Sequence, residues 1–370
     1  MSIWFFAMFI FVGAIFYIGW RIQQTFISPR HRNVYWLIFL LLSSSFLLAE
    51  RMEMGAASWI TEGLAWVGSY AAAVIFYAFW LLLLIDLVRL LDRWLGFIPL
   101  GIKKIPGKVG LVVVCLIIGL MVYGTWNAWH PMVNKYDISI NKTVPGTKEL
   151  HAVVVSDVHL GAFVTKNRLQ HMVNMINRQN PDIVFFAGDI IDGNTEPYVK
   201  NNMGAVLREL KPRLGIYMCM GNHDGHGSAA PYLEAAGVKV LRDQYQLIDG
   251  RFYIVGRDNM GFHGGDHVRK KLYDVIAGIN PKLPIIVLDH NPSTLEEAED
   301  NGVDLQLSGH THQGQMFPNN FITGNMYEVD HGLLRKGDLQ VIVSTGFGTW
   351  GPPIRVGNKP EIVDLTIRLK

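Results

Sequence analysis

The sequence predicts two structural parts, an all-α membrane region followed by an α/β domain. Charge gives the first indication, because of the 64 Asp, Glu, Lys and Arg residues 14 lie in residues 1–130 and 50 in residues 131–370. Hydropathy gives the second, because half of the residues are hydrophobic and the mean hydropathy of +0.21 is high for a purely soluble protein. In the second half, short apolar runs alternate with helix-like segments, which indicates buried strands joined by helices.

Charge-free stretches predict the membrane-spanning helices. Residues 1–20, 63–85 and 109–129 are each about as long as a bilayer crossing requires. A fourth run, residues 34–49, is shorter and contains three serines. The first run could be a signal peptide, but no Lys or Arg precedes it and no small-residue cleavage site follows it. We therefore predict a bundle of about four spans over residues 1–130.

Basic residues predict the orientation of this bundle. They gather in the first connection (Arg21, Arg30, Arg32) and in the third (Arg89, Arg93, Lys103, Lys104, Lys108). The positive-inside bias places both connections in the cytoplasm. Four spans then put both termini outside the cytoplasm, so we predict an integral protein of the cell (inner) membrane whose C-terminal domain is extracytoplasmic.

The remaining sequence predicts a linker with a leading strand over residues 131–149 and a domain over residues 150–370. From residue 131 onward there are 24 basic and 26 acidic residues, so no basic surface indicates a nucleic-acid partner. The two cysteines, Cys115 and Cys219, lack the spacing of a metal site.

Polar side chains follow five apolar runs of the second half, each at the point where a buried strand is predicted to end. The runs are followed by SDVH, GDIID, GNHD, DHNP and GHTH, which contain Asp157, His159, Asp189, Asp192, Asn222, His223, Asp224, Asp289, His290, His310 and His312. Ligands of α/β proteins bind at the carboxyl ends of strands, so these side chains are expected to converge. Carboxylates mixed with imidazoles suit Zn, Fe, Mn or Co, whereas Ca and Mg prefer oxygen ligands alone.

The ordered motifs SDxH, GDxxD, GNHD, an isolated strand-end His and GHTH resemble the calcineurin-like metallophosphoesterases. The C-terminal segment STGFGTWGPPIRVGNKPEI resembles the membrane-associated bacterial branch of that family. The resemblance covers residues 150–370 and implies an αββα sandwich. One departure is Gln313, where that branch often has glycine.

The resemblance also implies two divalent metal ions (Mn, Fe, Zn or Co) and their ligands. One metal is expected on Asp157, His159 and His312, a second on Asn222, His290 and His310, with Asp189 bridging the two. His223 is expected to donate a proton or a hydrogen bond to the leaving oxygen rather than to bind metal. Asp224 is expected to steady His223, and Asp192 to orient its loop.

This residue set predicts hydrolysis of phosphate esters or pyrophosphates. Such esters repel anionic nucleophiles, and two metals lower the pKa of a shared water and neutralise the phosphoryl oxygens. An acid at the leaving group typically adds about 10²- to 10⁴-fold. Membrane anchoring favours a lipid-linked substrate, although a tethered enzyme can also act on soluble nucleotides. The alternatives are a nucleotide or nucleic-acid phosphodiesterase and a non-catalytic metal-binding membrane sensor.

Other features leave two interpretations open. The segment 258–271 combines glycines with cationic residues, which fits either a phosphate-binding loop or a solvated turn. Trp350 either lies at the mouth of the site or the bilayer surface, or simply packs. His226, His263, His267 and His331 lack the strand-end pattern and are expected to be exposed.

Overall fold

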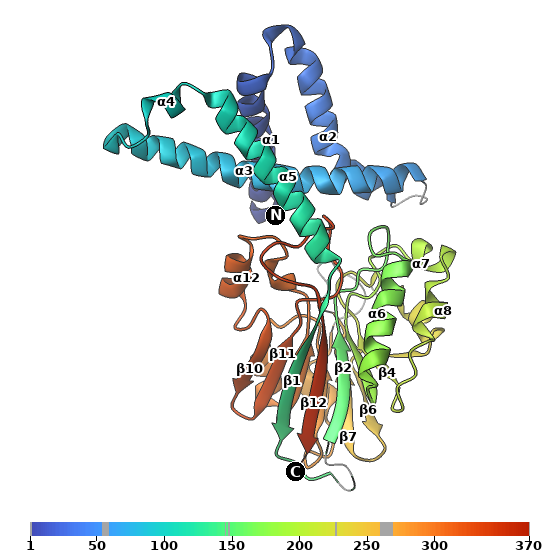
Figure 1. The fold of residues 1–370 in the computed structure, drawn as a ribbon. Helices are drawn as coiled ribbons and strands as arrows, with labels where there is room; N and C mark the ends of the chain where they lie inside the picture. Colours follow the sequence, from blue (N-terminus) through green and yellow to red (C-terminus); the bar gives the residue numbers. More distant parts are fainter. Residues whose placement is uncertain are drawn as a thin grey trace. The chain divides into compact units, whose positions relative to one another are not determined.

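The computed structural model describes residues 2–53, 59–144, 146, 149–225, 228–259 and 269–369 (Figure 1). It divides into two compact units. One comprises Met1–Thr125 with Gly351–Pro353, and the other comprises Trp126–Trp350 with Ile354–Lys370. The predictions for His226, His263, His267 and most of the segment 258–271 lie outside the described residues.

The first unit is helical. Its helices are α1 (Ser2–Phe26), η1 (Pro29–His31), α2 (Arg32–Glu53), α3 (Trp59–Leu95), α4 (Leu100–Lys103) and α5 (Pro106–Ala128), of which α5 ends in the second unit. Among the described residues, Ile60–Leu95 and Pro106–Ala128 are long and apolar enough to cross a membrane. Two of the four predicted spans therefore meet this test, and four spans in total stay a proposal.

The second unit is an αββα sandwich, as the family resemblance implies. One sheet has the order β1-β12-β2-β3-β4-β5, with β1 (Met132–Ile140), β12 (Glu361–Leu369), β2 (Glu149–Val155), β3 (Ile183–Ala187), β4 (Ile216–Cys219) and β5 (Val238–Leu241). The other has the order β10-β11-β9-β8-β7-β6, with β10 (Gly332–Lys336), β11 (Leu339–Val343), β9 (Leu305–Ser308), β8 (Ile285–Leu288), β7 (Phe252–Gly256) and β6 (Gln244–Ile248).

Helices cover the outer faces of both sheets. The first sheet packs against α6 (Lys166–Gln179), α7 (Glu196–Lys200), α8 (Met203–Leu207) and α9 (Ala230–Glu234), and the second against α10 (Leu272–Val275) and α11 (Leu295–Asp300). The central strands are buried on both faces, which is why the sequence shows continuous apolar runs there rather than alternation. Phe185 and Leu307 belong to the core between the sheets.

The strand directions bring the polar strand ends to one edge. Strands β2, β3 and β4 are mutually parallel, and so are β7, β8 and β9. Strand β1 is parallel to β12, and β12 is antiparallel to β2. Met132 therefore lies at the edge of the sheet where β2 ends, and the chain enters this unit at the edge that carries the predicted ligands.

Candidate metal centre

The turns after the strands hold the predicted ligands in a strained backbone. Asp157, Asp189 and His310 each lie two residues beyond a strand. Left-handed φ values occur at five of the seven predicted ligands, namely Asp157 (51°), His159 (53°), Asp189 (55°), His310 (73°) and His312 (47°). Non-glycine residues rarely adopt such values, and they concentrate at functional sites where the surrounding contacts hold them.

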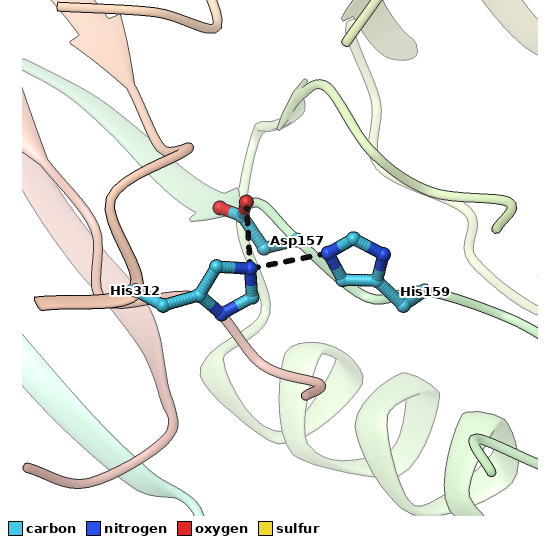
Figure 2. A group of neighbouring side chains, drawn as sticks. All are labelled: Asp157, His159 and His312. Atoms are coloured by element: carbon cyan, nitrogen blue, oxygen red, sulfur yellow. Dashed lines mark hydrogen bonds and ion pairs between the residues drawn. The ribbon is translucent and has the colours of Figure 1, made fainter. Parts of the chain in front are cut away.

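The first cluster consists of Asp157, His159 and His312 (Figure 2). The Nε2 atoms of the two imidazoles lie 3.1 Å apart, and His312 Nε2 lies 3.3 Å from Asp157 Oδ1. All three residues are buried. The structure thus brings the three residues predicted for one metal to a single point.

The second cluster consists of Asp157, Asp189 and His290. His290 Nδ1 lies 2.8 Å from the Ala187 carbonyl oxygen, which is only an acceptor, so this nitrogen carries the ring proton. His290 Nε2 is buried and makes no hydrogen bond to any described residue, although Asp189 Oδ2 lies 3.0 Å away. The same Asp189 oxygen lies 4.0 Å from His159 Nε2 of the first cluster, and Asp157 belongs to both clusters.

Asn222 and His310 lie beside each other at the partly exposed side of the site. His310 Nδ1 lies 2.8 Å from Asn222 Oδ1, and the His310 backbone N–H donates to both oxygens of Asp157. The His310 ring also lies edge-on to that of His290, with 5.1 Å between centroids. These positions are compatible with the predicted second metal, although neither residue belongs to the two clusters above.

A third cluster joins His159, Asp192 and His223. Asp192 Oδ1 lies 3.3 Å from His159 Nδ1 and 3.1 Å from His223 Nδ1. As an ionised carboxylate Asp192 accepts from both rings, which leaves each Nε2 facing away from it. The side chains of His223 and Asp192 are 29% and 31% exposed, unlike the buried clusters, so His223 is open to a substrate.

The donor atoms fit two divalent cations. Buried nitrogen and oxygen lone pairs point at one another at about 3 Å in both clusters, which is costly unless a shared cation or protons lie between them. Mixed imidazole and carboxylate donors are the set expected for Zn, Mn, Fe or Co. Without a cation, protons fill this role: burial opposes charge on His290, but Asp189 and Asp157 raise its pKa to about 10.

Asp192 produces the corresponding effect on His159. Burial again opposes charge on the ring, but the hydrogen bond and charge of Asp192, with Asp189 and Asp157, raise the pKa of His159 to about 9. The pKa of Asp192 itself is held well below its usual range, since hydrogen bonds from His159 and His223 outweigh its burial. Burial and the neighbouring charged His290 lower the pKa of His310 to about 3, which keeps that imidazole neutral.

Comparison with known proteins places this site in a family. The model of the calcineurin-like phosphoesterases matches residues 150–314. An uncharacterised metallophosphoesterase of Aquifex aeolicus is 34% identical over 255 residues, which cover 67% of this chain and 96% of that protein. This chain belongs to the calcineurin-like phosphoesterase family. It is a metal-dependent phosphohydrolase, and the family's dinuclear centre agrees with the paired clusters.

Two further relatives add to the comparison, one by the length of its match and the other by its description. An uncharacterised metallophosphoesterase of Campylobacter jejuni is 28% identical over 354 residues, which cover 90% of this chain and 88% of that protein. A Danio rerio protein described as a transmembrane protein with metallophosphoesterase domain is 31% identical over 270 residues, which cover 67% of this chain and 60% of that protein. The two apolar helices of this phosphoesterase, and the description of the Danio rerio relative as a transmembrane protein, fit membrane association.

Asp224 has a different position in the phosphoesterase from the one its predicted role requires. It is buried and accepts the backbone N–H groups of Asp189 (2.8 Å), Ile190 (2.9 Å), Ile191 (3.0 Å) and Gly221 (2.8 Å). The carboxylate beside the His223 ring is Asp192. Asp224 therefore holds the backbone of the loop that carries Asp189, and Asp192 orients His223.

Two glycines permit the close packing of the phosphoesterase site. Gly188 has a φ of 86°, and a Cβ atom there would lie 2.5 Å from His290 Nδ1. A Cβ atom on Gly221 would collide with the Asp189 carboxylate. Both positions need glycine because side chains from neighbouring loops occupy the space beside them.

Sequence reasoning missed Arg355 and Asn358. Arg355 is fully buried; its guanidinium lies 3.2 Å from His312 Nδ1 and donates to the carbonyl oxygens of Gly346 and Gly348. Asn358 Nδ2 donates to the backbone oxygen of His312 at 3.2 Å. Both lie in the C-terminal segment that carried the family resemblance, but they follow no strand end, so the pattern of polar strand ends could not find them.

Gln313 and Trp350 lie next to the ligands of the phosphoesterase. Gln313 has a φ of 49°, a value that glycine adopts without strain. The Trp350 ring is 54% exposed and its centroid lies 5.9 Å from that of His223. Trp350 therefore lies at the mouth of the site, the first of the two interpretations that the sequence left open.

Proposed function

We propose that this phosphoesterase is anchored in a membrane and hydrolyses a phosphate ester or pyrophosphate bond of a lipid-linked substrate. The observation that carries the proposal is that the chain passes from the apolar helix α5 into the catalytic unit at the edge of the sheet that holds the candidate metal ligands. Only three residues separate Ala128, the end of α5, from Met132, the start of β1.

Buried hydrogen bonds fix this connection to the site. Asn127 Nδ2 donates to the backbone oxygens of Arg355 (3.0 Å) and Asn358 (2.6 Å), the two residues that contact His312. Arg168 of α6 donates to the Ala128 carbonyl oxygen at 2.6 Å. The end of α5 is therefore bound to the segment that contacts His312.

An exposed apolar patch beside the ligands supports a lipid substrate. The α12 patch consists of Phe317, Phe321, Ile322 and Met326, which are 48–69% exposed on and before α12 (Asn320–Met326). Asp330 connects α12 to the ligand loop, since it accepts from Thr323 Oγ1 through its side chain and from Thr311 Oγ1 through its backbone. Adjacent exposed apolar side chains suit an acyl chain or the bilayer surface.

The chain's own residues supply positioning and proton transfer in this reaction. When bound, two divalent cations would supply activated water and neutralise the phosphoryl charge. Asp157, His159 and His312 would hold one, and Asn222, His290 and His310 the other, with Asp189 between them. Asp192 accepts the His223 Nδ1–H and so presents Nε2 to the leaving oxygen, where it donates the proton.

The domain boundaries and the topology are part of the same proposal. Residues 1–130 form the membrane domain with four spans in the inner membrane, and residues 150–370 form the extracytoplasmic phosphoesterase domain. A cysteine introduced at Lys370 should react with an impermeant maleimide in intact cells. Labelling only after lysis would reverse the orientation.

A substrate series tests the lipid assignment. Purified full-length protein loaded with Mn²⁺ should hydrolyse a dioleoyl lipid monophosphate or pyrophosphate with a higher kcat/KM than the dihexanoyl analogue or nucleotides. The variant Phe321→Ser/Met326→Ser should lose about tenfold on the long-chain lipid while it retains hydrolysis of a soluble aryl phosphate. Faster hydrolysis of nucleotides would favour a nucleotide phosphodiesterase, and bound metal without any turnover would favour a sensor.

A further inference from the structure

We propose that the membrane half, residues 1–130, contains a second binding site, which binds the phosphate headgroup of an anionic lipid. A cleft of about 690 Å³ lies between α1, α3 and α5, within the helical unit. Its volume is in the range of pockets that hold small organic ligands. This cleft is separate from the metal clusters and serves no step of the proposed hydrolysis.

The charges on the cleft favour an anion. Arg21, Arg89 and Arg93 line it, and Asp86 is the one acidic residue among its lining residues, so two positive charges are in excess. Asp86 forms an ion pair with Arg21 and accepts the Tyr17 hydroxyl at 2.6 Å. The Asp86 carboxylate is therefore already satisfied by two partners.

The other two arginines are available to a ligand. Arg89 is 3.9 Å from Asp86 and its side chain is 47% exposed. Arg93 is exposed and has no acidic partner in the part of the chain that the structure describes. The nearby carboxylate of Asp92 does not line the cleft and is paired with Lys103 at 2.5 Å. Two guanidinium groups separated by one helical turn can both contact a phosphate, which arginine binds through paired hydrogen bonds.

The walls of the cleft identify a lipid rather than free phosphate. Apolar side chains continue from the arginines along the helices and include Leu82, Leu90, Val109 and Val113. A free anion gains nothing from such walls, whereas the acyl chains of a phospholipid pack against them. Basic pockets between membrane helices typically bind phosphate headgroups of anionic lipids, and each nearby cation contributes about 1 kcal/mol.

Lipid binding to the purified full-length protein in neutral detergent tests the site. The probes are dioleoyl phosphatidylglycerol, dioleoyl phosphatidylcholine with the same acyl chains, and inorganic phosphate. Two excess cations predict about 10- to 30-fold tighter binding of phosphatidylglycerol than of phosphatidylcholine. Arg89→Gln/Arg93→Gln should remove this preference. Lys104→Gln/Lys108→Gln should retain it, because it removes two charges nearby that do not line the cleft.

A folding control keeps the test decisive. Arg89→Lys/Arg93→Lys retains the charge and should keep most of the preference, which separates loss of charge from loss of structure. Equal binding of the two lipids by the wild type, or an equal loss in both glutamine variants, would overturn the proposal. Competition by inorganic phosphate as strong as that of phosphatidylglycerol would also overturn the lipid assignment. These readouts do not depend on phosphoesterase activity.

Discussion

The phosphoesterase domain and the membrane half concentrate charge of opposite sign. In the domain, the carboxylates of Asp157, Asp189 and Asp192 surround imidazoles that are neutral when they bind metal, so the site attracts cations. In the membrane half, three arginines and only one aspartate line the cleft, so that site attracts anions. The sign of the excess charge indicates the ligand class of each region.

The two regions also differ in backbone strain. Within the described residues, every non-glycine residue with a left-handed φ belongs to the phosphoesterase domain, and Gly96 is the first residue of any type with positive φ. Lipid offers no partner to a freed backbone group, so membrane helices stay regular. The catalytic turns tolerate strain because carboxylates such as Asp224 bind their backbone N–H groups.

Removal of one charge should break the cation site and leave the anion site intact. Asp189→Asn removes the carboxylate that lies 3.0 Å from His290 Nε2 and accepts the backbone N–H of His223. We expect at least about a 10³-fold loss of aryl phosphate hydrolysis, equivalent to about 4 kcal/mol, and a fall from two bound metals per chain. Metal analysis and steady-state rates measure both effects.

Asp137→Asn is the matched control, since this exposed carboxylate of β1 pairs only with Arg368 among the described residues. It should change neither rate nor metal content, and both variants should bind phosphatidylglycerol as the wild type does. Loss of lipid binding in Asp189→Asn would show that the two regions are coupled.

The next largest effect on the rate distinguishes residues that take part in proton transfer from residues that bind metal within the domain. His223→Gln should lower the rate by about 10²-fold with both metals retained, because the proton donor is lost. Asp192→Asn should lower it about tenfold, since it removes the carboxylate beside the His223 ring. Loss of metal in His223→Gln would show that this histidine is a ligand instead.

Asp224→Asn should act on stability rather than on the reaction. Its four backbone donors lose a charged acceptor in a buried place, which should lower the free energy of unfolding by about 2–3 kcal/mol. Chemical denaturation measures this loss. A tenfold rate loss with unchanged stability would instead return Asp224 to the role that the sequence suggested.

These roles mark the limit of sequence reasoning. The ends of the strands could be predicted from the sequence. Parallel strands with two buried faces appear there as continuous apolar runs followed by turn residues, as before Asp157 and His290. The sequence could not show whether Asp192 or Asp224 contacts the His223 ring, because both residues lie in turns that follow predicted strands. Only the path of each loop decides which carboxylate meets the His223 ring and which turns inward to the backbone.

Long-range contacts were equally hidden. Arg355 contacts His312, which lies 43 residues away in the sequence, and no local sequence pattern predicts this contact. In the membrane half, apolar composition indicated spans but not the cleft, since α1, α3 and α5 form it only when packed. The strand-end motifs and the family resemblance thus predicted the αββα sandwich and the side chains that gather at the candidate metal centre, whereas the contacts that orient these side chains depend on tertiary structure.

A smaller effect concerns Arg355, a buried arginine that supports the metal ligands, in contrast to the arginines of the cleft, which are proposed to bind an anion. Arg355→Lys should weaken metal affinity about tenfold, because a lysine cannot hold His312 and two carbonyl oxygens with one planar group. Metal titration of the chelator-treated protein measures this. Arg368→Lys, at an exposed ion pair, is the control and should bind metal normally. Normal affinity in Arg355→Lys would limit Arg355 to packing.

The smallest change alters only pH, and its effect on the cation site is the difference in stability between the metal-free and the metal-loaded protein. In the metal-free fold the pKa values of His159 and His290 are raised to about 9 and about 10, above the value of about 6.5 expected in the unfolded chain. Their protonation therefore stabilises the metal-free fold fully below about pH 6.5, and this contribution is lost as pH rises through 9 to 10. The raised pKa of Asp224, about 6, acts below this window.

Melting temperatures of the chelator-treated protein should thus decline from pH 7 to pH 10 more steeply than those of the Mn²⁺-loaded protein. Metal displaces these protons, so the loaded site no longer titrates in that range. Other groups that ionise above pH 9, such as the buried Cys219 thiol with its raised pKa, are common to both forms and cancel in the difference. Parallel declines in the two forms would mean that His159 and His290 hold no extra protons before metal binds.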